Sequence, residues 1–231
     1  MRRYKAILFD VGDTLIHYCP TSAEVIRMRL ELLGIRVETE TAARLDRTVE
    51  LRTAAQIYDE ICGAPRMEDV LFAKMLDDTV LAEVGAVSES EAFAKSRGSF
   101  PQTKVVDEDA FILLEQLKQR YLLGIVSNYG ASLVDDLKRM RLSEYFGTII
   151  VSAVVGLEKP NPDIFIMAAH ELACRADECL YVGDHPFDVM GAVSAGMDAA
   201  WLKYKFHEMP SYIKEKPTYT LEALHELNQI L

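Results

Sequence analysis

Short apolar segments that each end at a polar residue or a glycine turn are the feature that most limits how this chain can fold. The first, residues 6–9, stops at Asp10. Apolar residues that follow one another without alternation are typical of strands buried on both faces, as in parallel sheets. Three further segments repeat the design and a fifth shows it more weakly: residues 121–126, 148–151, 179–182 and 198–202. The sequence therefore predicts a parallel sheet.

Helical patterns lie between these predicted strands. Residues 107–120 and 130–140 carry apolar side chains at intervals of three and four, which places them along one face of a helix. Asn161 can cap a third helix whose first position is Pro162. Strands that alternate with helices form a sheet covered on both faces, so the predicted fold class is α/β with a doubly wound parallel sheet.

Between the first two predicted strands lie roughly a hundred residues, far more than an ordinary crossover needs. They begin with a capping box from Thr21 to Glu24, and further helices are expected at residues 39–62, 67–83 and 88–95. We therefore expect a helical lobe inserted at residues 17–96 into a core made of residues 1–16 and 97–231.

Charge and composition limit the classes of molecule that this protein is expected to bind. The formal net charge is −11, and clusters of Lys and Arg that would hold a phosphate backbone are lacking, so a nucleic-acid partner is not expected. A small anionic substrate needs only a local positive site. Uninterrupted apolar stretches of about 18 residues are also lacking, so no membrane partner is expected. Oligomeric state is not determined by these features.

The expected location is the cytoplasm. The first ten residues have too short an apolar run for a signal peptide and no small-residue cleavage site. The four cysteines, Cys19, Cys62, Cys174 and Cys179, contain no Cys-x-x-Cys pair and no nearby His at a zinc-type spacing. We expect free thiols that are mostly buried.

Polar residues follow several of the predicted strands. In open parallel sheets, ligands bind outside the carboxyl ends of the strands. Those ends carry Asp10, Ser127 with Asn128, and Asp184 with Asp188, and Lys159 sits in the loop after the strand at residues 148–151. Three carboxylates and an ammonium group are thus expected at one edge of the sheet. Ser127 and Asn128 precede a predicted helix, where side chains and free amide groups can cradle an anion.

This set resembles the haloacid dehalogenase-like hydrolase superfamily, in the subgroup with a helical cap. The four motifs that carry the resemblance occur in order at residues 9–15 (FDVGDTL), 126–128 (VSN), 159–165 (KPNPDIF) and 183–192 (GDHPFDVMGA). The resemblance covers the whole core and implies a Rossmann-like fold. It also implies that the inserted helical lobe closes over the substrate as a cap.

The resemblance implies a magnesium-dependent phosphatase that acts on a small phosphorylated metabolite. Asp10 would be the nucleophile that forms an aspartyl-phosphate, which a carboxylate can do when it is fixed in line with a phosphoryl group. Lys159 would neutralise the phosphoryl oxygens and pair with Asp10. The expected Mg²⁺ ligands are Asp10, the backbone carbonyl of Gly12, Asp184 and Asp188, and the expected substrate-binding residues are Thr14, Ser127 and Asn128.

One position departs from the family pattern. Phosphatases of the family usually carry a second Asp two residues after the nucleophile, where it protonates the leaving group and later activates water. This chain has Gly12 there, and the next carboxylate is Asp13. Gly12 keeps a carbonyl that can bind a metal, but it has no side chain to transfer a proton. Asp13 can take the acid/base role if Gly12 lets the turn follow an unusual path.

Three alternatives to this interpretation stay open. Catalysis can proceed slowly without a general acid, or only on substrates with good leaving groups. A dehalogenase of the family lacks the second Asp and attacks carbon, but such enzymes usually also lack the acidic pair that Asp184 and Asp188 form here. The protein can also be a non-catalytic binding protein that keeps the fold and the metal pocket.

Overall fold

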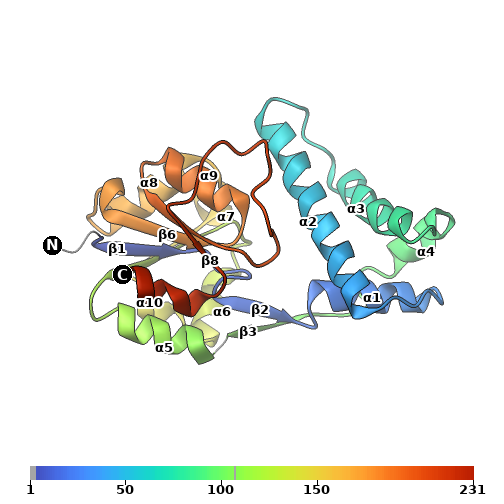
Figure 1. Cartoon of the computed structure of the whole chain (residues 1–231), viewed down its shortest axis with the longest axis horizontal. Helices are drawn as coiled ribbons and strands as arrows, with labels where there is room; N and C mark the ends of the chain where they lie inside the picture. Colours follow the sequence, from blue (N-terminus) through green and yellow to red (C-terminus); the bar gives the residue numbers. More distant parts are fainter. Residues whose placement is uncertain (1–3, 107) are drawn as a thin grey trace. The chain divides into compact units, whose positions relative to one another are not determined.

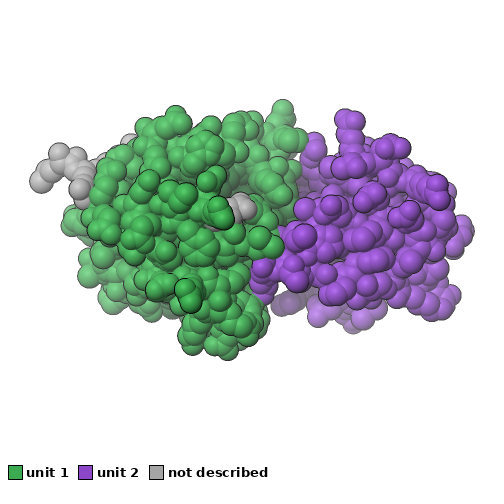
Figure 2. All heavy atoms as spheres, turned by 90° about the horizontal axis from the view of Figure 1, so that it is seen from below, with its two compact units in different colours: residues 1–17, 105–231 green, residues 18–104 purple. Residues whose placement is uncertain are grey.

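The computed structural model describes residues 4–106 and 108–231, which form two compact units. Unit 1 comprises residues 1–17 and 105–231, and unit 2 comprises residues 18–104; Figure 2 shows them in green and purple. The second boundary falls later than residue 96, because the chain continues after helix α4 (Ser90–Lys95) into strand β3 (Thr103–Val106). Strand β3 pairs with β2 (Ile16–Cys19) in a two-stranded sheet.

Unit 1 is built on a six-stranded parallel sheet with the order β5-β4-β1-β6-β7-β8. All five predicted strands are present in this sheet, and one of its six strands was not predicted, nor were β2 and β3. The bounds are β1 Ala6–Phe9, β4 Leu122–Ser127, β5 Thr148–Val151, β6 Cys179–Gly183, β7 Asp198–Leu202 and the unpredicted β8 Tyr219–Leu221. Strand β1 lies at the centre, and its four residues are fully buried, as its uninterrupted apolar sequence predicts.

Helices cover both faces of this sheet, so the predicted α/β fold class is confirmed. In Figure 1, α8 and α9 lie over one face and α5 and α10 over the other. Asn161 caps α8 by accepting a hydrogen bond from the backbone N–H of Asp163, as predicted. Asp107, the predicted start of α5, lies outside the described residues. The helix bounds are α5 Glu108–Leu117, α6 Leu133–Arg139, α7 Ser152–Val155, α8 Pro162–Glu171, α9 Pro186–Ser194 and α10 Leu227–Ile230.

Unit 2 is helical and has its own small core. Its helices are α1 Ser22–Leu32, α2 Thr39–Ile61, α3 Asp69–Glu83 and α4. The predicted capping box is present, since Thr21 and Glu24 satisfy each other's backbone N–H groups. Six buried side chains form the core of the unit: Ile26, Leu30, Leu45, Val80, Leu81 and Phe93.

A buried ion pair ties the helices of unit 2 together. The Asp77 carboxylate, on α3, is 4 % exposed. Its Oδ1 accepts a hydrogen bond of 2.8 Å from Arg29 Nη2, and its Oδ2 lies 2.5 Å from Arg97 Nη2. The Arg29 guanidinium also lies 3.8 Å from the centre of the Phe93 ring, as in a cation–π contact. One carboxylate is thus paired with two arginines.

All four cysteines are free, as predicted, but the prediction that most are buried is wrong. Only Cys179, at the start of β6, is buried, whereas Cys19 and Cys62 are exposed. Cys19 ends the short strand β2 and Cys62 follows the end of α2, and both places face solvent. In the part of the chain that the structure describes, no helix combines the length and the apolar character needed to cross a membrane.

Candidate active site

The register of the central strands brings the predicted site residues together. Phe9, the last residue of β1, is level with Ile125 of β4 on one side and Val182 of β6 on the other. The residues that follow therefore leave the sheet at the same edge. The backbone N–H of Asp10 continues the ladder by donating to the Val182 carbonyl at 2.9 Å.

Three carboxylates meet at this edge. Asp10, Asp184 and Asp188 each place one oxygen within 4.8 Å of the others. All three are buried, with exposed fractions of 8 %, 5 % and 1 %. Asp184 follows β6 directly, and Asp188 lies in the first turn of α9, where its Oδ2 accepts a hydrogen bond of 3.0 Å from the His185 N–H. The tight turn needs Gly183, since a Cβ there would come within 2.3 Å of Asp188 Oδ2.

The Lys159 ammonium group lies between two of these carboxylates. Its Nζ is 2.7 Å from Asp10 Oδ1 and 2.6 Å from Asp188 Oδ1, and the side chain is 5 % exposed. Burial by itself disfavours a charged lysine, yet the Asp10 and Asp188 carboxylates raise the pKa of Lys159 above its ordinary value. Lys159 is therefore a buried, positively charged group that contacts the predicted nucleophile.

Two carboxylates of the acidic cluster have raised pKa values. Burial, followed by the charge of Asp10, raises the pKa of Asp184 well above its ordinary value. Burial raises the pKa of Asp188 to about 6, although the Lys159 charge acts in the opposite direction. Carboxylates so buried are stable in the ionised form only with further cationic partners.

Tyr181, a residue that the sequence did not single out, also contacts this cluster. Its hydroxyl donates to the Val126 carbonyl at 2.7 Å and lies 3.1 Å from Lys159 Nζ and 3.2 Å from Asp188 Oδ1. Burial, followed by the charge of Asp188, raises the pKa of Tyr181, which keeps the phenol neutral. No sequence pattern marks it, because a tyrosine inside a buried strand looks like any other core residue.

Of the predicted substrate-binding residues, Thr14 and Ser127 lie at the same edge. Ser127 ends β4 with 2 % of its surface exposed, and the Thr14 hydroxyl is 3.5 Å from Asp184 Oδ1. The Asn128 side chain instead contacts the backbone of Lys159: Oδ1 accepts from the Lys159 N–H at 2.7 Å, and Nδ2 donates to its carbonyl at 2.9 Å. Asn128 thus fixes the position of the lysine.

Asp13 belongs to the loop of residues 10–15, between β1 and β2, and its backbone has an unusual conformation. Its φ of 53° lies in the left-handed region, which Asp tolerates better than most residues. Asp13 Oδ2 lies 2.9 Å from Lys205 Nζ, and Oδ1 lies 4.0 Å from His17 Nδ1. Its charge is among those that raise the pKa of Asp184, after burial and the charges of Asp10 and Asp188. Asp13 is therefore close enough to the cluster to affect it.

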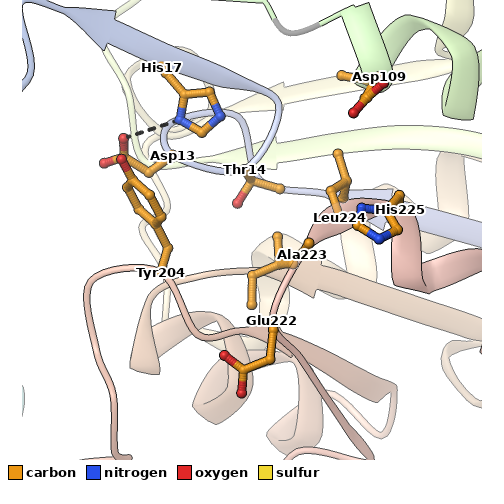
Figure 3. Close-up of a pocket in the computed structure, with 11 residues that line it drawn as sticks. Asp13, Thr14, His17, Asp109, Tyr204, Glu222, Ala223, Leu224 and His225 are labelled. Atoms are coloured by element: carbon orange, nitrogen blue, oxygen red, sulfur yellow. Dashed lines mark ion pairs between the residues drawn. The ribbon is translucent and has the colours of Figure 1, made fainter.

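A cavity of about 200 Å³ opens beside Asp13 within unit 1. In Figure 3, Asp13, His17 and Tyr204 lie on one side of it and Leu224 and His225 on the other. The His17 and Tyr204 rings are 5.6 Å apart. The lining residues are Asp13, Thr14, His17, Asp109, Ala110, Leu202, Tyr204, Glu222, Ala223, Leu224 and His225. Asp13 and Thr14 are thus the residues of the loop 10–15 that line this cavity.

The donor set fits a hard divalent cation. Three buried carboxylates offer oxygen atoms close to one another, and burial raises the pKa of Asp184 and Asp188, so that a bound cation would favour their ionised form. Mg²⁺ prefers a few carboxylate oxygens together with water. An α/β protein with such a cluster at the carboxyl edge of its sheet, joined by a buried lysine, has the layout of a metal-assisted hydrolase.

Comparisons with known proteins agree with this class. A family model described as haloacid dehalogenase-like hydrolase matches residues 7–202. The chain therefore belongs to the haloacid dehalogenase-like hydrolases, as its motifs predicted. A glyceraldehyde 3-phosphate phosphatase of Methanopyrus kandleri is 29 % identical over 240 residues, which span 96 % of this chain and 98 % of the relative.

Solved structures show the same fold. The YfnB protein of Bacillus subtilis, determined bound to magnesium, aligns with a TM-score of 0.69 at 24 % identity and covers 100 % of this chain and 99 % of its own. A 2-haloacid dehalogenase from Pseudomonas syringae aligns with a TM-score of 0.56 at 24 % identity, covering 98 % and 97 %. These likenesses concern the fold alone, so the reaction has to be argued from the site.

Proposed function

We propose that the protein is a magnesium-dependent phosphatase that hydrolyses a small phosphomonoester through an aspartyl-phosphate on Asp10. The observation that carries this proposal is the buried contact of Lys159 with both Asp10 and Asp188, inside a cluster of three carboxylates. Phosphoryl transfer depends mainly on positioning and on neutralising the charge of the phosphoryl oxygens. A buried ammonium group and a metal-type carboxylate cluster supply both requirements.

The proposed metal ligands are the Asp10, Asp184 and Asp188 carboxylates, with the backbone carbonyl of Gly12 as a further ligand. Bound there, Mg²⁺ would neutralise negative charge on the phosphoryl group. Asp10 attacks phosphorus, and Lys159 holds Asp10 and attracts the phosphoryl oxygens. Thr14, Ser127 and Asn128 are proposed to surround the phosphate, Asn128 by keeping Lys159 in place.

Asp13 is proposed as the group that transfers the proton, since Gly12 has no side chain for it. Asp13 lines the 200 Å³ cavity, which has room for a leaving group, and its charge acts on Asp184, which supports this role. In the first step Asp13 would give a proton to the leaving oxygen. In the second it would take one from the water that hydrolyses the aspartyl-phosphate. The helical unit 2 is proposed to select the substrate as a cap.

The similarity to a glyceraldehyde 3-phosphate phosphatase supports a small phosphorylated substrate. The rival reaction is hydrolysis of a carbon–halogen bond. The buried Asp184 and Asp188 argue against it, because attack on carbon has no use for a metal-type cluster beside the nucleophile. A third candidate function is metal binding without efficient catalysis, because Gly12 has no side chain that could act as the acid.

The test compares the wild type with Asp10→Asn on a panel of phosphate esters and a short haloacid, with Mg²⁺ and with a chelator. We expect the wild type to hydrolyse phosphate esters only with Mg²⁺, and Asp10→Asn to lose on the order of 10³-fold or more in kcat. Asp135→Asn, on an exposed helix position, is the matched control and should keep full activity. Haloacid turnover without metal would identify the rival reaction, and an active Asp10→Asn would disprove the nucleophile.

A further inference from the structure

Lys205 is a charged residue of unit 1 that lies outside the four motifs yet close to the site. It belongs to the loop between β7 and β8, and its side chain is 15 % exposed. Its Nζ lies 2.9 Å from Asp13 Oδ2. Asp13 follows Gly12 in the loop of residues 10–15. The contact therefore connects the β7–β8 loop to the part of the chain that departs from the family pattern.

The loop is held against the site by the next residue. Phe206 is 1 % exposed, and its ring meets the His185 ring edge-on at 5.2 Å between centres. His185 caps α9 through Nδ1, which accepts from the Phe187 N–H, and it lies between Asp184 and Asp188 in the chain. The position of Lys205 is therefore fixed by packing on the same turn that carries two of the three clustered carboxylates.

Lys205 brings a positive charge to the edge of the sheet where the carboxylates meet. Its Nζ lies 2.9 Å from Asp13 Oδ2, and the neighbouring Phe206 packs on His185, which lies between Asp184 and Asp188 in the chain. Two ammonium groups thus contact acidic side chains of this site: Lys159 contacts Asp10 and Asp188, and Lys205 contacts Asp13.

We propose that Lys205 is a positioning residue of this site: its ammonium group holds the Asp13 carboxylate and supplies a second positive charge that lets a phosphate dianion approach the acidic cluster. The inference rests on the proposed function, since it concerns the phosphate and metal that the same site would bind. Lys205 acts through Asp13 and through its charge, without forming a bond to the substrate.

This role predicts opposite effects on the two ligands. Removing a positive charge beside an acidic cluster strengthens its attraction for Mg²⁺ and weakens its attraction for phosphate. A lysine that only stabilised the fold would not separate the two, because a loosened site binds both ligands less well. The signs of the two changes therefore identify the role.

The experiment measures binding by calorimetry in Lys205→Met and Lys205→Arg, first with Mg²⁺ alone and then with inorganic phosphate in saturating Mg²⁺. We expect Lys205→Met to bind Mg²⁺ up to roughly tenfold more tightly and phosphate roughly tenfold more weakly. Lys205→Arg keeps the charge and should stay within about twofold of the wild type for both ligands. Lys203→Met is the matched control: Lys203 lies two residues away, pairs with Glu222 at 3.5 Å, and should change neither affinity.

The inference is overturned if Lys205→Met weakens both ligands, if it leaves both unchanged, or if Lys203→Met has the same effect. Should Lys205→Met not fold, the same titrations on Lys205→Gln decide the matter. Failure of the proposed function would show separately, because a wild type that binds Mg²⁺ and phosphate but hydrolyses no ester leaves the effects at Lys205 measurable.

Discussion

Each unit of this protein buries a cluster of charged side chains, and the two clusters differ in their balance. In unit 2, one carboxylate, Asp77, is paired with Arg29 and Arg97. In unit 1, Asp10, Asp184 and Asp188 lie together, the buried cation Lys159 contacts Asp10 and Asp188, and the pKa values of Asp184 and Asp188 are raised. Because the unit 2 carboxylate has ionic partners within the fold, that cluster stabilises the folded structure and needs no ligand. A cluster left with excess negative charge has to take up protons or bind a cation, which marks it as a candidate functional site.

The cluster in unit 2 should therefore be sensitive to loss of its one carboxylate. Asp77→Asn leaves Arg29 without its ionic partner in a buried position, and we expect the free energy of unfolding to fall by about 3 kcal/mol. Mg²⁺ affinity should not change, since the clustered carboxylates belong to unit 1. Denaturant unfolding and Mg²⁺ titration measure the two quantities.

A neighbouring residue provides the control for this substitution. Asp78 is 37 % exposed and pairs with Lys74, so Asp78→Asn should cost less than about 0.5 kcal/mol. Equal losses in the two variants, or a changed Mg²⁺ affinity in Asp77→Asn, would contradict the view that the unit 2 cluster is purely structural.

The unit 1 cluster should respond to pH and metal together. Burial raises the pKa of Asp188 to about 6 and that of Asp184 also above its ordinary value, so the folded, metal-free protein holds protons that the unfolded chain releases above about pH 4. The free energy of unfolding contributed by these groups is therefore highest at low pH, and it falls as pH rises from about 4 through 6.

Mg²⁺ should reverse this loss because it binds the deprotonated carboxylates. The stabilisation by Mg²⁺ should be small near pH 4.5 and grow toward pH 7, where a concentration 100 times Kd contributes about 2.7 kcal/mol. Thermal unfolding at several pH values, with Mg²⁺ and with a chelator, gives the difference directly. A Mg²⁺ effect that is independent of pH would mean that protons and metal do not compete for the same carboxylates.

The smallest expected effect concerns Tyr181, whose hydroxyl joins Lys159, Asp188 and the Val126 carbonyl. Tyr181→Phe keeps the ring and removes the hydroxyl, so we expect the free energy of unfolding to fall by about 1 kcal/mol. Because Lys159 then loses a contact that fixes its position, turnover of a phosphate ester should fall roughly tenfold.

Tyr4→Phe is the matched control for Tyr181→Phe. Tyr4 is 3 % exposed and its hydroxyl donates to Asp198 at 2.7 Å, away from the acidic cluster. Both variants should lose similar stability, and only Tyr181→Phe should lose turnover. If both lose turnover equally, the effect comes from general loosening of the sheet.

Local pattern predicted most of the secondary structure. The uninterrupted apolar segments located five strands, because strands buried on both faces need apolar side chains at successive positions. The same reasoning missed the two-stranded sheet of β2 and β3, and it missed β8, since a three-residue edge strand with one buried side chain, Leu221, has too little pattern to recognise. It also misjudged Cys19 and Cys62, whose exposure depends on the ends of β2 and α2.

By itself, the sequence determined the α/β fold class and, through its four motifs, the family. It also predicted that Asp10, Asp184 and Lys159 meet at one edge, because parallel strands end on the same side of a sheet. Only the tertiary structure decided how these groups are paired and what surrounds them. Tyr181, Lys205 and the Asn128 contact with Lys159 join residues far apart in the chain, and such contacts follow from packing, for which a single sequence carries no local signal.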